Sequence, residues 1–319
     1  MSELRKFIVS EDANIVRVDK FLAEKMPEFS RSEIQKFSIS REDGAPLKMS
    51  EKIRIGDVFI VEIPEKKTDV ATENISSDFD LDILFEDDDL IVLNKPKEML
   101  CHPTKFERDY TLSNALLFHT KGKLSNLAGD DRLGIVHRLD KNTSGLMLAA
   151  KNNEAHENLS KQIKEKTAIR KYLAIALVEF NNKEGVIDKP LLHSLKDDVK
   201  MIVSDNGLEA ITNYKVLEEY KGASLVELNL KTGRTHQIRA HLASIGHPVF
   251  GDSLYGAKSF MRNEFYNLKT IEQLLQSYYI SFSHPKIGER LEFQLEEKDF
   301  SKDFIKVLNF LRSKNNGFI

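Results

Sequence analysis

Apolar segments of strand length, spaced unevenly along the second part of the chain, constrain the fold more than any other feature of the sequence. Helices are expected over 153–166, 234–245 and 301–314, and the polar segment 259–277 is also interpreted as helical. Because strands and helices alternate irregularly, and several strands are close enough to form hairpins, an α+β fold with a mixed, largely antiparallel sheet is favoured over a doubly wound parallel one. The expected strands are DDLIVLNKP, SGLMLAAK, RKYLAIALV, ASLVELNLK and YYISFS.

A smaller unit precedes this sheet. Apolar residues recur at helical spacing over 17–26, and a second short helix is expected to follow. The alternation within 52–64 predicts two half-buried strands around a turn at Gly56. The next stretch has no apolar period and is interpreted as a solvated linker. We therefore expect a small α/β domain over 1–66, an acidic linker over 67–80 and a larger domain over 81–319.

Composition excludes several classes of protein. Cys101 is the only cysteine, so an intramolecular disulfide and a zinc site with two or more thiolate ligands are excluded. No apolar stretch approaches the roughly 18 to 20 residues of a membrane-spanning helix, and the N-terminus lacks the continuous apolar segment of a secretory signal. We therefore expect a cytoplasmic protein that does not enter a membrane.

The charges are segregated along the chain. The formal net charge is −3 and the sequence pI is near 6.3, which by itself does not favour a nucleic-acid binder. Residues 68–93, however, hold nine acidic and no basic residues, whereas residues 94–319 hold 34 basic and 28 acidic residues. The global balance therefore leaves room for a basic face on the larger domain.

Motifs for nucleotide and metal binding are absent from the sequence. It contains neither the phosphate-binding G-x-x-x-x-G-K-[ST] pattern, nor G-x-G-x-x-G after a strand, nor H-E-x-x-H. His236 and His241 are five residues apart, which places them on different faces of the expected helix. No metal site is therefore expected.

Two clusters of polar residues stand out in the larger domain. The loop from Gly134 to Gly145 carries a histidine, an arginine, an aspartate and a lysine between two strands; alternatively, it is a surface turn capped by Asp140. The segment from Lys231 to His241 places two arginines at a helix N-terminus, which suits a phosphate or a buried carboxylate. Alternatively, those arginines pair with surface acids.

These clusters resemble the signatures of a known enzyme family. The motif His137-Arg-Leu-Asp-x-x-Thr-Ser-Gly145 is similar to the signature of the RluA-type pseudouridine synthases, and in particular to RluC- and RluD-like members. Further matches are Asp89-Leu-Ile-Val-Leu-Asn-Lys-Pro, Arg170-Lys-Tyr-Leu-Ala and Gly233-Arg-Thr-His-Gln-Ile-Arg through Asp252. The resemblance covers roughly 81–296. Separately, Arg17-Val-Asp-Lys-Phe-Leu and Ser30-Arg-Ser resemble an RNA-binding domain like that of ribosomal protein S-four.

The resemblance implies a reaction and its catalytic residues. Pseudouridine synthases isomerise uridine within RNA without a cofactor, and the aspartate of the first signature, here Asp140, is the essential group. An arginine of the third motif keeps that carboxylate ionised, which corresponds to Arg239, with Arg234 as the alternative. The tyrosine of the strand motif, Tyr172, is implied beside the target base.

Binding residues are implied in the same way. Arg138 is implied to fill the space that the flipped base leaves. The implied substrate is ribosomal RNA of the large subunit. The sequence departs from the family pattern at Glu98, where glycine is usual. The other implied substrate-binding residues are His137, Arg234, Lys95 and Thr143, and the implied RNA contacts of the N-terminal domain are Lys20, Arg31, Lys36 and Lys52.

Three alternative functions share part of this pattern. A non-catalytic RNA-binding factor of ribosome assembly would share the fold, and a pseudouridine synthase acting on transfer RNA would share the chemistry as well. A nucleoside or glycoside hydrolase would need two carboxylates at the site, whereas the motif supplies only Asp140.

Overall fold

The computed structural model divides the chain into two compact units, Met1–Ile75 with Asn126–Leu133, and Ser76–Ser125 with Gly134–Ile319. Most of the expected linker 67–80 and the start of the second expected helix lie outside the described residues. No helix among the described residues is long and apolar enough to cross a membrane. The structure describes residues 3–10, 17–29, 34–35, 37–63, 79–104, 106–194, 197, 199–260, 265, 267–268, 270 and 272–315.

The first unit has its own small sheet and core. The sheet is antiparallel in the order β1-β3-β2, and Phe21, Leu22 and Phe59 are buried between the sheet and the helix. Helix α1 confirms the helix expected over 17–26. Its elements are β1 (Glu3–Ile8), α1 (Val18–Lys25), β2 (Ser38–Arg41) and β3 (Val58–Ile63), and the short 3-10 helix η2 (Asp130–Arg132) is grouped with this unit.

The prediction of two strands within 52–64 is wrong for its first half. Lys52 forms only an isolated bridge to Arg17, and the sheet positions on either side of β3 are taken by β1 and β2. Ile53 is buried without being part of a strand, while Ile55 is 56% exposed. The first half of the segment is therefore a turn rather than a strand, and only Ile53 of its apolar residues packs in the core.

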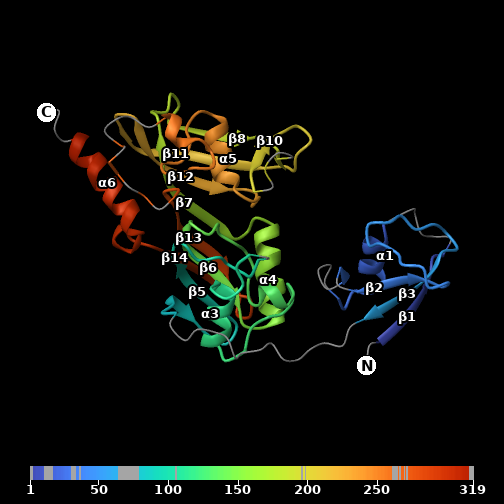
Figure 1. Cartoon of the computed structure of the whole chain (residues 1–319). Helices are drawn as coiled ribbons and strands as arrows, with labels where there is room; N and C mark the ends of the chain where they lie inside the picture. The colour runs from blue at the N-terminus through green and yellow to red at the C-terminus, as the bar shows by residue number, and fades with distance from the viewer. Residues whose placement is uncertain are drawn as a thin grey trace. The chain divides into compact units, whose positions relative to one another are not determined.

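The second unit is built on a nine-stranded mixed sheet (Figure 1). Its strand order is β4-β5-β6-β13-β7-β12-β11-β8, with β14 also pairing with β13. Every pairing is antiparallel except the one between β6 and β13, which confirms the predicted mixed, largely antiparallel class. The strands are β4 (Asp82–Glu86), β5 (Leu90–Lys95), β6 (Ser144–Ala150), β7 (Ile169–Leu177), β8 (Glu184–Asp188), β11 (Ile211–Tyr220), β12 (Ala223–Leu230), β13 (Leu275–Ser283) and β14 (Arg290–Gln294).

Successive residues of the central strands enter two apolar layers, one on each face of the sheet. In β7, Leu173 and Ile175 pack in the layer that contains residues of α4 and α6, whereas Tyr172 and Ala174 pack in the layer that contains residues of α3 and α5. A two-stranded ribbon, β9 (Leu191–His193) with β10 (Met201–Val203), packs beside α5. The helices are α3 (Leu112–His119), α4 (Asn153–Lys164), α5 (Gln237–Ser244), α6 (Lys302–Asn315), η3 (Ala257–Phe260) and η5 (Glu297–Asp299).

The helix expected over 259–277 is wrong at its C-terminal end. Strand β13 begins at Leu275, and its alternate residues are buried in the two layers. Several residues between 261 and 271 lie outside the described part of the chain.

The backbone around Gly145 explains why the first signature ends in glycine. Its φ is +123°, and a Cβ there would lie 2.1 Å from the carbonyl oxygen of Ser277, across the single parallel pairing of the sheet. Any side chain at this position would therefore push β6 and β13 apart.

We predict that Gly145→Ala lowers the free energy of unfolding by more than about 2 kcal/mol, because the methyl group meets backbone that cannot move aside. Gly246→Ala is the matched control, since φ there is also positive (+85°) but the space is open. It is expected to cost only about 1 kcal/mol. Equal losses in chemical denaturation would contradict the prediction.

Glu98, the departure from the family pattern, adopts the backbone conformation that glycine favours. Its φ is +64°, which costs a non-glycine residue about 1–2 kcal/mol. We therefore predict that Glu98→Gly raises the free energy of unfolding by about 0.5–1 kcal/mol, after allowing for the greater freedom of glycine in the unfolded chain. Glu98→Ala, which removes the carboxylate but keeps the strain, should show no such gain.

Candidate active site

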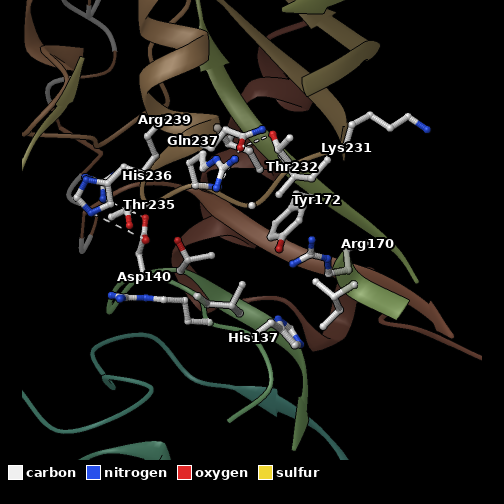
Figure 2. Close-up of a pocket in the computed structure, with 18 of the residues that line it drawn as sticks. His137, Asp140, Arg170, Tyr172, Lys231, Thr232, Thr235, His236, Gln237 and Arg239 are labelled. Atoms are coloured by element: carbon white, nitrogen blue, oxygen red, sulfur yellow. Dashed lines mark hydrogen bonds and ion pairs between the residues drawn. The ribbon is translucent and has the colours of Figure 1, made fainter. Parts of the chain in front are cut away.

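One cavity of about 450 Å³ opens between the loop before β6, the exposed end of β7 and the start of α5 (Figure 2). This volume is within the range of roughly 300–1,000 Å³ that is usual for small-ligand pockets. The structure places seven of the eight expected catalytic and substrate-binding residues in its lining. They are His137, Arg138, Asp140, Thr143, Tyr172, Arg234 and Arg239.

Asp140 lies on the loop before β6, and its side chain is 18% exposed. Its Oδ2 accepts a hydrogen bond from Arg239 Nη1 at 3.1 Å, and its Oδ1 lies 3.9 Å from His236 Nε2 (Figure 2). The turn that carries it is closed by the Thr143 N–H, which donates to the Asp140 carbonyl. A partly exposed carboxylate next to a fixed cation stays available to a ligand in the cavity.

Arg239 is held in place by Asp252, which is fully buried. Its Nε and Nη2 donate to the two carboxylate oxygens of Asp252 at 2.7 and 2.9 Å, which leaves Nη1 for Asp140. The ring of Tyr255 lies 5.2 Å from the guanidinium carbon. Burial opposes the positive charge, but the hydrogen bonds and charges of Asp252 and Asp140 outweigh it and raise the pKa of Arg239 above its ordinary value.

The start of α5 is fixed by a buried amide. Gln237 Oε1 accepts from Thr232 Oγ1 and from the Arg234 N–H, while its Nε2 donates to the Ile211 carbonyl and to Thr212 Oγ1. This amide ties the loop before the helix to β11. Arg239 therefore enters the cavity from a rigid helix rather than from a loop.

His236 immediately precedes α5 in a left-handed conformation, with φ of 51°. Its Nδ1 lies 3.3 Å from the hydroxyl of Tyr255, which itself accepts from the Met201 N–H. Burial lowers the pKa of His236, and Arg239 lowers it further against the opposing charge of Asp140. The imidazole is therefore neutral at neutral pH.

Tyr172 lines the cavity from β7 and is 4% exposed. Burial raises the pKa of its hydroxyl above the ordinary value, so the phenol is protonated at neutral pH. Arg138 is exposed at the cavity rim, and Arg234 donates from Nε to the carbonyl of Glu209 rather than contacting Asp140. The cation that contacts Asp140 is therefore Arg239 and not the alternative, Arg234.

Lys95 is the expected substrate-binding residue that the structure places elsewhere. It is fully buried, and its ammonium group donates to the carbonyl oxygens of Pro96, Met99 and Lys141. All three N–H groups are therefore engaged with backbone, and no contact with a substrate is left. In this structure Lys95 ties the loop after β5 to the residue that follows Asp140.

The N-terminal residues belong to a different unit. Lys20 and Lys52 are exposed, whereas Arg31 and Lys36 lie outside the described residues.

A group of potential metal ligands lies away from the cavity. Atoms of Asp87, Asp89 and His284 all lie within 4.8 Å of one another. However, one oxygen of Asp87 accepts from the N–H groups of Asp89 and Leu90, and the other lies 2.6 Å from His284 Nε2. These hydrogen bonds already account for the group as a structural contact between the β4–β5 loop and the loop after β13.

The residues of the site that the sequence analysis did not identify are His236, Asp252, Tyr255 and Arg170. The first two fall within the third motif, so their place in that motif was the available signal. Tyr255 lies just beyond the motif, and only the fold shows its contact with His236.

His137 gives the fold an acid-sensitive group. Its Nε2 accepts from the Leu148 N–H at 3.0 Å, and burial lowers its pKa from 6.5 to about 3. The unfolded chain therefore takes up a proton below pH 6.5 that the folded chain does not, so stability falls as the pH falls from about 6.5 to about 3. We predict that His137→Gln, whose amide oxygen can also accept from Leu148, flattens this dependence by up to about 1.4 kcal/mol per pH unit in denaturation measured across pH. An unchanged slope would contradict this assignment.

Comparison with known proteins identifies the family of this chain. Residues 89–244 match the family described as RNA pseudouridylate synthase. The chain is 38% identical over 309 residues to the RNA pseudouridine synthase YlyB of Bacillus subtilis (95% of this chain, 96% of that one). It is 39% identical over 300 residues to ribosomal large subunit pseudouridine synthase D of Zymomonas mobilis (92% and 93%).

A solved structure shows the same relationship. Human RNA pseudouridylate synthase domain containing 4 superimposes with a TM-score of 0.55 at 26% identity, over 72% of this chain and 92% of that one. The relatives match nearly the whole chain, and the family match spans the loop of Asp140, strand β7 and the helix of Arg239. The chain therefore belongs to the RNA pseudouridine synthases, and within them to the RluA type.

Proposed function

We propose that this enzyme converts specific uridines of large-subunit ribosomal RNA to pseudouridine, with Asp140 as its essential catalytic residue. The observation that carries the proposal is the Asp140 carboxylate, which faces a cavity of nucleotide-binding size while contacting a buried, doubly anchored arginine. The choice of RNA is supported by the names of relatives, which are large-subunit enzymes in several bacteria.

The reaction is an isomerisation. The bond between ribose C1′ and uracil N1 breaks, the base rotates, and C1′ joins C5; the proton lost from C5 is balanced by one gained at N1. A carboxylate can act as a nucleophile on the base or the sugar, or as a base toward the sugar. Arg239 orients the Asp140 carboxylate for any of these roles, because its Nη1 donates to Oδ2 at 3.1 Å.

We infer the roles of two other lining residues from the family resemblance. Tyr172 presents a protonated phenol on which the uracil can stack and through which a proton can pass. Arg138, which is exposed on the same loop as Asp140, would occupy the space that the flipped base leaves in the RNA.

We also propose that the N-terminal unit binds RNA in the manner of an S-four-like domain. Its support is the resemblance of its sequence, together with the exposure of Lys20 and Lys52 on a small sheet-and-helix unit with its own core. Such contacts position RNA through its phosphates without reading its sequence.

Mapping of pseudouridine in total RNA, at single-nucleotide resolution, tests the catalytic proposal. Cells that lack the gene should lose a few sites in large-subunit RNA, and the wild-type chain should restore them. Asp140→Asn should not restore them, and its rate on the isolated RNA should fall by more than about 10³-fold. Asp205→Asn, the same change in an exposed turn, is the matched control and should restore every site.

Each other outcome contradicts a different part of the proposal. Restoration by Asp140→Asn would show that this carboxylate is not essential. Lost sites in transfer RNA would overturn the substrate, and unchanged RNA in cells that express the protein would favour a role in ribosome assembly without catalysis.

A further inference from the structure

Arg170 is the second residue of β7. It is a buried cation that has no anionic partner among the described residues. The residue is 8% exposed, its Nε is enclosed without an acceptor, and its guanidinium makes no hydrogen bond or ion pair within the described part of the chain. A guanidinium that is largely withdrawn from water without a counter-charge destabilises the fold. Such a group is retained where a ligand supplies the missing charge.

The free end of Arg170 faces the cavity. Figure 2 shows its guanidinium turned toward Tyr172, on the side of the cavity away from Asp140 and His236. It also faces Gly233, where a Cβ would lie 3.5 and 3.7 Å from Nη2 and Nη1. Because Gly233 has no side chain, the two Nη atoms stay uncovered on this side.

The acids of the cavity do not neutralise Arg170. Asp140 and Glu209 are the acidic residues of the lining that the structure describes, and Asp140 contacts Arg239 instead. The same wall carries Lys164, Lys166 and Lys231, which are exposed. This part of the cavity is therefore cationic, with one buried arginine and three exposed lysines.

We infer that Arg170 binds a phosphodiester group of the RNA, next to the nucleotide that enters the cavity, and that the three lysines contact phosphates further along the strand. The inference rests on the proposed function, because it takes RNA as the ligand of this cavity. A phosphate brings the negative charge that Arg170 lacks and matches the geometry of its paired N–H groups. A uracil carbonyl would satisfy a hydrogen bond but would leave the buried charge uncompensated.

The salt dependence of RNA binding separates a phosphate contact from a base contact. We would measure the affinity of the full-length chain, carrying Asp140→Asn to prevent turnover, for a single-stranded oligouridylate at several potassium chloride concentrations. Adding Arg170→Met should weaken binding and reduce the slope of log affinity against log salt by about 0.7, as expected for one lost phosphate contact on a single strand. Arg170→Lys should retain the slope.

Two further variants serve as controls. Lys171→Met removes the same charge from the next residue of β7 and should leave the slope unchanged. The side chain of Lys171 lies on the opposite face of the strand, where it forms an ion pair with Glu227. Gly233→Ala keeps the charge of Arg170 but covers its free end at ordinary contact distance, so it should weaken binding as Arg170→Met does.

The folding of the variant gives an independent readout. If Arg170 serves RNA binding rather than the stability of the fold, the Arg170→Met variant without RNA should unfold at an unchanged or higher denaturant concentration. A marked fall would show that Arg170 supports the fold, and weaker binding with an unchanged slope would show a base contact; either result overturns the inference.

The outcome is separable from that of the proposed function. A changed slope in a chain that modifies no RNA would leave the phosphate contact standing and remove the catalytic proposal. If pseudouridine formation depends on Asp140 but Arg170→Met leaves the salt slope unchanged, only the inferred phosphate contact would be contradicted.

Discussion

The active site depends on one buried guanidinium that is shared by two carboxylates. Asp252 holds two nitrogens of Arg239 in a planar, bidentate pair, and this fixes the direction of the third nitrogen toward Asp140. Because its position is fixed and it is buried, this cation acts on Asp140 more strongly than a mobile surface arginine could. The geometry of Asp140 is thus set by a residue that faces away from the cavity.

The sheet supplies the rigidity that this arrangement needs. Asp140 precedes β6, Tyr172 lies in β7, and β13 pairs with both strands. The close approach of β6 and β13 at Gly145 leaves no room for a side chain, and Gln237 ties the start of α5 to β11. Segments that are about 100 residues apart in the chain are therefore held in one fixed geometry. The strained backbone of His236, at the start of α5, is an expected cost at such a site.

Much of the fold could be predicted from local patterns, and the failures share a cause. The strands with continuous apolar runs, β5, β6, β7, β12 and β13, were predicted because both of their faces are buried. Strands β8, β11 and β14 were missed, since charged and polar residues on their exposed faces interrupt the apolar pattern. The false strand at Lys52–Gly56 shows the reverse error, in which apolar residues serve a turn that packs on the core.

The sequence by itself determined the family and the candidate site residues: the motif around Asp140, the tyrosine of β7 and the arginine of α5 are local patterns of residue type and spacing. Only the tertiary structure decided which of two arginines contacts Asp140, that Lys95 is enclosed by backbone carbonyls, and that Arg170 faces the cavity without a counter-charge. The physical reason is that the state of a charged side chain depends on its burial and on its partners. Those partners come from strands and helices far away in the chain, so no local pattern records them.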